Sequence, residues 1–218
     1  SSVLPDQSFL TGVNSAYNFI SLDGSNEYID AGTGIGNALG DNYAGDLSVS
    51  IWINQDIASA DDGIFYIGSM TGNYGGFSIN NGGSSRLYVR LNNNAWFGTV
   101  DNDVTDTWQH IAFVYKAGSE SDTKFYINGV SQTITTSGSL YPFEGSIGQT
   151  AIYNKELSAT EVGAIHTLGR HGNLLDKYAD NLLGYWAMGA LDASTGLSDS
   201  ISTIYDRSGN SNHGTPQN

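Results

Sequence analysis

Hydrophobic and polar residues alternate with a period of two along most of the chain, which is the pattern of β-strands with one buried face. The clearest run is Leu47 to Asn54, in which one face carries only aliphatic residues and the other carries Ser, Trp and Asn. The run Trp108 to Tyr115 is apolar on both faces, which predicts a central strand. Shorter strands are predicted at 17–22, 63–67, 76–80, 87–91, 95–100 and 146–153.

Turns and a single helix complete this pattern. The dipeptide Asn128-Gly129 separates two strand-like runs and predicts a two-residue hairpin turn, and Asn81-Gly82-Gly83 predicts a second hairpin. The run Ser158 to Glu161 has the form of a capping box, and apolar residues follow at helical spacing as far as Gly169. One short helix among many strands predicts an all-β fold, in which two antiparallel sheets pack as a jelly-roll sandwich.

Composition narrows the function classes. The 218 residues include no cysteine, which excludes disulfides, thiolate metal sites and cysteine nucleophiles. The net charge of −14 repels phosphate backbones, so we expect no nucleic-acid partner. No apolar run approaches the roughly 20 residues of a membrane span, so we expect no membrane insertion. Because the chain begins at Ser1 without a methionine, we expect a processed product or a fragment.

Four segments resemble a known family. They are AYNFISLDGSNEYIDAG, DLSVSIWIN, DTWQHIAFVYKAGSESDTKFYINGV and FEGSIGQTAIYNKELSATEVGAI, and they lie in order between residues 16 and 169. Together they resemble laminin-G-like domains of the concanavalin A-like lectin/glucanase family. The resemblance implies the jelly-roll fold. It leaves the function open, because this sandwich carries lectins, adhesins, glycanases and plain spacers.

The C-terminal tail, residues 181–218, departs from the family's order. It resembles the segment that usually precedes the first strand of such a domain. Either the domain is circularly permuted, or the tail begins a second repeat. We favour permutation, and hence a single domain over residues 1–218, because a half-repeat would expose Leu182, Leu183, Tyr185 and Trp186. Chains with such a tail resemble modules of bacterial surface and phage virion proteins, which implies an extracellular, cell-surface or virion location and other assembly subunits as partners.

We expect no catalytic site. The glycanases of this fold use an E-x-D-x-x-E strand motif, and none occurs in the chain. The nearest spacing, Asp101-x-Asp103-x-x-Asp106, falls in a predicted turn rather than along a strand, which favours a solvated loop. The four histidines lack the i, i+4 spacing of a zinc motif, and His110 lies within a β-run, which favours a structural role.

A ligand site is predicted around Trp96. The other three tryptophans, Trp52, Trp108 and Trp186, lie in strongly apolar runs and are interpreted as core residues. Trp96 instead follows Asn92, Asn93 and Asn94, and Tyr74 lies in the glycine-rich run TGNYGG. An exposed aromatic ring stacks on the face of a sugar, and Asn side chains donate and accept hydrogen bonds. The alternative interpretation is that Trp96 only covers one edge of a sheet.

A structural calcium ion is predicted in the loop from Asp206 to Gly214. Calcium takes six to eight oxygen ligands, and the loop offers the Asp206 carboxylate and the side-chain amides of Asn210 and Asn212. If the tail packs before the first strand, Asp23 approaches the same point. The alternative is an Asx-turn, in which Asp206 accepts a hydrogen bond from the backbone two residues on.

These patterns predict a non-enzymatic binding module whose partner is a glycan or a surface polymer. The main alternative is a structural spacer or capsid-decorating jelly roll without a small-molecule ligand, and a glycanase is a more distant third. An exposed aromatic residue beside polar groups distinguishes the first from the second, and paired carboxylates in a cleft would indicate the third.

Overall fold

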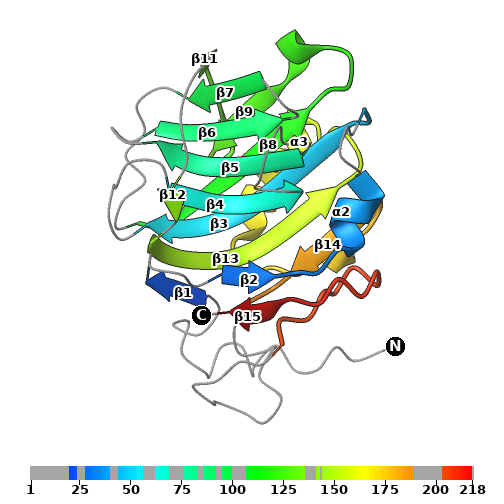
Figure 1. Cartoon of the computed structure of the whole chain (residues 1–218). Helices are drawn as coiled ribbons and strands as arrows, with labels where there is room; N and C mark the ends of the chain where they lie inside the picture. Colours follow the sequence, from blue (N-terminus) through cyan, green and yellow to red (C-terminus); the bar gives the residue numbers. More distant parts are fainter. Residues whose placement is uncertain are drawn as a thin grey trace.

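A computed structural model of the chain shows two stacked β-sheets, with the helix α3 (Ala159–Leu168) behind the larger sheet (Figure 1). All but one of the strand pairings within these two sheets are antiparallel, so the predicted sandwich is confirmed. The structure describes residues 20–23, 28–39, 44–55, 62–68, 76–82, 86–91, 95–99, 107–135, 141–142, 144–188 and 203–217.

Within the described residues, the larger sheet has seven strands. In spatial order they are β1 (Ile20–Asp23), β13 (Glu144–Tyr153), β3 (Leu47–Gln55), β8 (Gln109–Tyr115), β9 (Lys124–Ile127) and β10 (Val130–Gln132), with β14 (Leu182–Trp186) also paired to β13. The predicted central strand is β8, which lies between β3 and β9. The predicted hairpin turn joins β9 to β10 through Asn128 and Gly129, whose φ angles of 50° and 77° are those of a tight turn with left-handed residues.

In the part of the chain that the structure describes, the smaller sheet has six strands. In spatial order they are β11 (Ile134–Thr135), β7 (Ala95–Thr99), β6 (Arg86–Leu91), β5 (Gly76–Gly82), β4 (Asp62–Gly68) and β12 (Tyr141–Pro142). Four of these strands were predicted from alternation. Strands β5 and β6 pair as the second predicted hairpin, but Asn81 and Gly82 of the predicted turn belong to β5 and pair with Leu87 and Arg86. The parallel pair in this sheet is β12 with β4.

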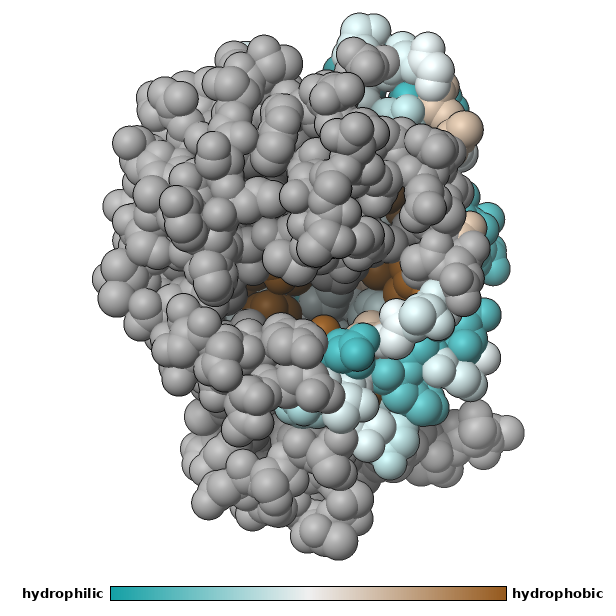
Figure 2. Space-filling view, in the orientation of Figure 1, coloured by the Kyte–Doolittle hydropathy of each residue, from teal (hydrophilic) through white to brown (hydrophobic). Residues whose placement is uncertain are grey.

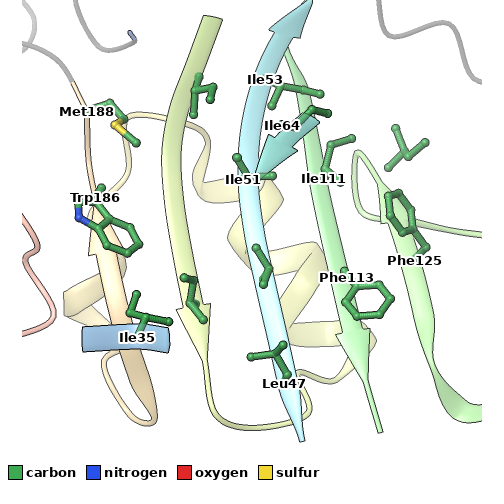
Figure 3. Packing of buried hydrophobic residues seen from close by; sticks show 14 of the residues in the cluster. Ile35, Leu47, Ile51, Ile53, Ile64, Ile111, Phe113, Phe125, Trp186 and Met188 are labelled. Atoms are coloured by element: carbon green, nitrogen blue, oxygen red, sulfur yellow. The ribbon is translucent and has the colours of Figure 1, made fainter. Parts of the chain in front are cut away.

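The main core lies between the two sheets. The aliphatic residues that alternate along β3 are at most 1% exposed and belong to it, as the period of two predicts. Figure 3 shows residues of this core from β3, β8 and β9, together with Trp186, on the face of the larger sheet that is turned away from the helix. Each such side chain contributes roughly 1.5–3 kcal/mol when it is fully buried.

A second core lies on the opposite face of the larger sheet. There Ala112, Val114 and Tyr153 pack against Val162 and Ile165 of α3. The predicted capping box is present, because the Ser158 side chain accepts from the backbone of Glu161 while the Glu161 side chain accepts from that of Ser158. The helix ends at Gly169, as predicted, and the 3-10 turn η4 (Leu174–Asp176) follows it.

The tail packs within the same sandwich. Strand β14 lies along the edge of β13 that also holds β1, and its Leu182, Tyr185 and Trp186 are buried. Beyond it, a bridge joins Trp186 to Asp206, and β15 (Thr215–Gln217) pairs with β2 (Tyr28–Asp30) from the other end of the chain (Figure 1). The sequence did not predict β2 or β15.

Besides η4, two helical segments of the described residues were also not predicted. The helix α2 (Gly34–Leu39) is six residues long and contains two glycines, so its intrinsic helix propensity is low. Its Ile35 is only 5% exposed, which shows that contacts with the core hold it in place. The 3-10 turn η3 (Glu120–Asp122) links β8 to β9. Within the described ranges, no helix is both long and apolar enough to cross a bilayer.

Candidate functional site

The register of the smaller sheet places Trp96 in a row that crosses four neighbouring strands. Trp96 of β7 lies opposite Arg90 of β6, which lies opposite Ser78 of β5, and Ser78 lies opposite Tyr66 of β4. Residues that face each other across antiparallel strands share one face of a sheet, with their Cβ atoms about 4.5–5.5 Å apart. We call these four residues the Trp96 row.

A second row runs beside it on the same face. Tyr88 of β6 lies opposite Asn80 of β5 and opposite Gly98 of β7, and Asn80 in turn lies opposite Gly63 of β4. We call these four residues the Tyr88 row. The two rows together contain aromatic, amide, hydroxyl and guanidinium groups. Gly98 leaves the backbone beside Tyr88 without a side chain, and Gly63 does the same beside Asn80.

The other face of these strands has a different composition. In β5 and β6 the positions that alternate with the two rows are apolar, except for Asn81 at the end of β5: they are Phe77, Ile79, Leu87, Val89 and Leu91. An apolar face is what packing against a second sheet requires. The alternation therefore predicts that the two polar and aromatic rows lie on the face away from the core.

The structure covers only part of the predicted ligand site. Trp96 is the second residue of β7 and pairs with β6. Tyr74, Asn92, Asn93 and Asn94 lie outside the described residues, as do Asp101, Asp103 and Asp106. The site around Trp96 thus stays a prediction, to which the register adds neighbours that the sequence alone did not supply.

The loop predicted to hold calcium is organised around Asp206. This residue is 6% exposed, and its carboxylate accepts hydrogen bonds from the backbone N–H groups of Tyr185 (2.9 Å), Ser208 (2.8 Å) and Asn212 (2.9 Å). Burial by itself raises the pKa of Asp206, but a hydrogen bond from the Ser208 side chain and these backbone hydrogen bonds outweigh it and hold the pKa below its usual range. The bond from Ser208 is the Asx-turn that the sequence offered as an alternative to a calcium site.

Of the other proposed calcium ligands, Asn210 and Asn212 belong to this loop, whereas Asp23 lies far from it. The amide nitrogens of Asn210 and Asn212 both donate to the carbonyl of Leu183, at 3.1 Å and 2.9 Å, so both side chains fasten the loop to β14. Asp23 does not join them. It pairs with Glu144, whereas Trp186, the bridge partner of Asp206, pairs with Thr150 about 20 Å further along β13.

Calcium at this loop stays a prediction. Among the described residues, no group of three or more His, Asp or Glu side chains comes close enough to hold a metal ion. Amide and backbone oxygens of the loop are additional oxygen donors, and calcium accepts such donors.

Figure 2 shows mainly hydrophilic and neutral colours over α2 and the C-terminal segment, while the strongest hydrophobic colour appears at the floor of the central hollow.

The histidine predicted to be structural lies in a buried ring cluster. His110 of β8 is 0% exposed, and its Nε2 is 2.9 Å from the Ser50 hydroxyl. Its ring lies 5.2 Å from the Trp52 ring and 5.6 Å from the His166 ring of α3. Burial, together with the neighbouring His166, lowers the pKa of His110 to about 3, so the imidazole is neutral at physiological pH.

The tryptophans interpreted as core residues are largely covered. Trp186 is 3% exposed and donates from Nε1 to the carbonyl of Asn212, which ties the tail loop to the core. Trp52 is 8% exposed. Trp108 is half-buried, with the Arg170 guanidinium 4.3 Å above its ring.

Comparison with known proteins agrees with this architecture. The family model described as the concanavalin A-like lectin/glucanases superfamily matches residues 23–140, more than half of the chain. The chain belongs to the concanavalin A-like lectin/glucanase superfamily. No curated protein matches the chain.

Solved structures of other members of this fold share little sequence with the chain. A proposed carbohydrate-binding protein of Bacteroides ovatus superposes with a TM-score of 0.63 at 15% identity, over 93% of this chain and 58% of its own. The chain therefore spans a little more than half the length of that protein. The CBM40 module of the Ruminococcus gnavus IT-sialidase, bound to α2,3-sialyllactose, superposes with a TM-score of 0.53 at 13% identity, over 68% of this chain and 96% of its own.

The sequence identified Trp96 as a candidate ligand residue of this superfamily member, but it did not identify the other residues of the Trp96 row. The signal was available in β6, where RLYVRL alternates two arginines and a tyrosine with three aliphatic residues. That alternation places Arg86, Tyr88 and Arg90 on one face. It does not say which residues of β5 and β7 stand beside them, because that depends on the pairing register.

Proposed function

We propose that the chain is a carbohydrate-binding module that holds a glycan on the smaller sheet, across the Trp96 and Tyr88 rows. The observation that supports this proposal is the register, which pairs Trp96 with Arg90 and continues the row through Ser78. Such a surface combines apolar rings with a few convergent polar groups, which is the composition of small-molecule sites in general.

The two rows suit the chemistry of a sugar. One face of a pyranose ring is lined by C–H groups and stacks on an aromatic ring, while its hydroxyls need donors and acceptors at the edge of that ring. Trp96 supplies the ring, and Ser78 and Asn80 supply hydroxyl and amide groups. Gly98 lies two residues after Trp96 in β7, and a strand glycine permits the close approach of a ligand to the backbone.

Proteins with the same fold support the glycan class. The Ruminococcus gnavus module was solved with α2,3-sialyllactose and also with α2,6-sialyllactose. At 13% identity these structures show a shared fold and not a shared site. They favour a carbohydrate over other small molecules as the ligand of this chain.

A glycan array tests the proposal. The wild-type chain should bind at least one glycan, and Trp96→Ala should weaken that binding by about 1–2 kcal/mol, which is roughly a five- to thirtyfold loss of affinity. Tyr205→Ala is the matched control, because Tyr205 is an exposed aromatic residue (41%) of the tail and lies outside the smaller sheet. Full binding by Trp96→Ala would place the site elsewhere, and an array without any ligand would favour a spacer.

We also propose that the module is non-catalytic. The sequence lacks the E-x-D-x-x-E motif of the glycanases of this fold, so we expect no release of reducing sugar from β-glucans. Measurable release that is abolished by Asp103→Asn would contradict this.

The proposed setting is a larger assembly outside the cytoplasm. Glycan recognition by a strongly acidic module suits a surface that meets polysaccharide or host cells. Cell fractionation followed by detection with a specific antibody tests the setting, and a purely cytoplasmic signal would overturn it.

A further inference from the structure

The hairpin turn between β9 and β10 holds a reactive pair of residues. Asn128 and Gly129 form its two-residue loop, with φ angles of 50° and 77°. Because glycine has no side chain, nothing shields its backbone nitrogen from the amide of a preceding asparagine. That nitrogen can attack the side-chain carbonyl carbon, which makes Asn-Gly the dipeptide most prone to lose its side-chain amide.

Hydrogen bonds to strand β8 hold the Asn128 side chain. Its Oδ1 accepts from the backbone N–H of His110 at 2.9 Å, and its Nδ2 donates to Oε1 of Gln109. The backbone N–H of Asn128 also donates to the carbonyl of His110, at 2.8 Å. Both ends of the amide group are therefore engaged while the hairpin is closed.

The tip of the hairpin rests against helix α3. A Cβ atom added to Gly129 would lie 3.2 Å from Nδ1 of His166 and 3.6 Å from Cα of Gly163, both of which belong to the helix. The His166 ring is in turn 5.7 Å from the Trp52 ring and 5.6 Å from the His110 ring. Packing against α3 therefore adds to the hydrogen bonds that keep the turn closed.

We propose that Asn128 is a modification site, at which the amide becomes a carboxylate when the hairpin opens away from α3. The Gly129 nitrogen forms a bond to Cγ of Asn128, the side-chain nitrogen leaves as ammonia, and a five-membered succinimide ring results. Water then adds to one of the two ring carbonyls and breaks its bond to the ring nitrogen. Cleavage at Cγ gives an aspartate at position 128, and cleavage at the backbone carbonyl gives an isoaspartate, in which the main chain runs through the side chain.

Both products weaken the closed turn. An aspartate at position 128 has no N–H donor for Oε1 of Gln109 and adds a negative charge beside that oxygen. An isoaspartate adds one carbon to the main chain, which a two-residue turn does not accommodate. The reaction is irreversible, so the modified fraction of molecules records how often the hairpin has left α3.

Peptide mapping by mass spectrometry tests the site. Trypsin places the two Asn-Gly pairs of the sequence, at residues 81–82 and 128–129, in separate peptides, because Arg86 and Lys124 lie between them. Incubation at mildly alkaline pH in concentrated urea should convert both pairs, because nothing holds the side chains of an unfolded chain. In the folded protein, conversion at Asn128 should be slower by about tenfold or more, because only the opened fraction of molecules reacts.

The variant His166→Ala tests the contact with α3. Without the imidazole the hairpin tip loses a neighbour on the helix, so conversion at Asn128 in the folded protein should rise about threefold or more, with no change in urea. His171→Ala, at an exposed position beyond the end of α3, is the matched control and should leave both rates unchanged. Ion exchange separates the converted protein by its additional negative charge, and its melting temperature should be lower than that of the unmodified protein.

Three results would overturn the proposal. They are no conversion at Asn128 in urea, equal conversion in urea and in the folded protein, and a folded His166→Ala variant that converts at the wild-type rate. The comparison of wild type with and without urea needs no variant, so a folding defect of His166→Ala does not hide the answer. None of these results depends on whether the module binds a glycan.

Discussion

At the scale of single residues, His110 shows how burial sets a protonation state. It is fully buried between the larger sheet and α3, and its Nε2 faces the Ser50 hydroxyl. Its other ring nitrogen, Nδ1, has no hydrogen-bond partner among the described residues. The groups packed around it, Trp52 and His166, carry no negative charge that would stabilise an imidazolium.

This environment predicts an acid-dependent loss of stability. The pKa of His110 is about 3 in the folded protein and 6.5 when unperturbed, so only the unfolded chain takes up a proton between these values. The free energy of unfolding should therefore fall as the pH drops below about 6.5, by up to ~1.4 kcal/mol per pH unit from this group. Urea unfolding between pH 5 and pH 7 measures the slope.

The variant His110→Gln should flatten that slope, because glutamine does not titrate. His171→Gln should change the slope less, because His171 is exposed and less of its ring is removed from water. If wild type and His110→Gln have equal slopes between pH 5 and pH 7, His110 is protonated in the folded protein and the assignment is wrong.

Two glycines with opposite surroundings, one crowded and one open, give a second prediction at the residue scale. A Cβ atom added to Gly184 would lie 2.5 Å from the Trp186 ring and 2.9 Å from Ile35, whereas one added to Gly163 meets nothing within 4 Å. Gly184→Ala should therefore destabilise the protein by about 1–3 kcal/mol through overpacking. Gly163→Ala, within α3, should stabilise it by about 0.5–1 kcal/mol. Thermal unfolding of both variants checks the two signs.

At the scale of elements, the loop around Asp206 joins β14 to the end of the tail. Asp206→Ala would leave the N–H groups of Tyr185, Ser208 and Asn212 without their acceptor. Each buried unpartnered group costs about 1–3 kcal/mol, so we expect a loss of about 2–5 kcal/mol in the free energy of unfolding at pH 7. Because folding lowers the pKa of Asp206, this contribution fades as the pH falls below about 4.

The same loop allows a direct test of calcium. If an ion binds there, excess calcium raises the melting temperature, a chelator lowers it, and Asp206→Ala removes the response. A melting temperature that is indifferent to both additions, with no metal found by elemental analysis, would show that hydrogen bonds alone hold the loop.

Sequence predicted the elements whose signals are local. The alternation along β3 and the capping box at Ser158 are written in consecutive residues, and both predictions are confirmed. Strand β2 and helix α2 were not predicted, because contacts with residues far away in the sequence stabilise them. A Cβ on Gly214 would lie 2.7 Å from Ile29 of β2, and Gly34 of α2 lies against the Asn212 side chain.

The candidate site divides in the same way. Trp96 stood out from the sequence because three asparagines precede it. Its neighbour Arg90 could not be identified, because the register between β6 and β7 is not written in either strand. Tyr66 was further hidden by a bulge at residues 63–65 of β4, which shifts the register against β5. A shift of one residue moves every side chain of a strand to the other face, so local patterns cannot settle such neighbours.

At the scale of the whole molecule, the tail should be required for cooperative folding. Deleting residues 181–218 removes β14 from the edge of β13 and strips Trp186, Met188 and Ile204 from the main core. We expect the truncated chain to show no cooperative transition in calorimetry or urea titration. Trp186→Ala is the milder variant and should cost about 3–5 kcal/mol. A truncated chain that melts like the intact one would contradict the interpretation of the tail.

The pairing of β2 with β15 also has a consequence for how the chain is made. Thr215 pairs with Asp30, so a contact that closes one end of the sandwich cannot form until the ribosome has passed far beyond the first of its two strands. Until then the edge of β13 that β14 will cover is open, and exposed strand edges recruit other chains. Pairings this distant in sequence form slowly, on a scale of milliseconds to seconds in comparable β-proteins. The nascent protein therefore depends on whatever shields that edge, such as a chaperone, more than the stability of its finished core would suggest.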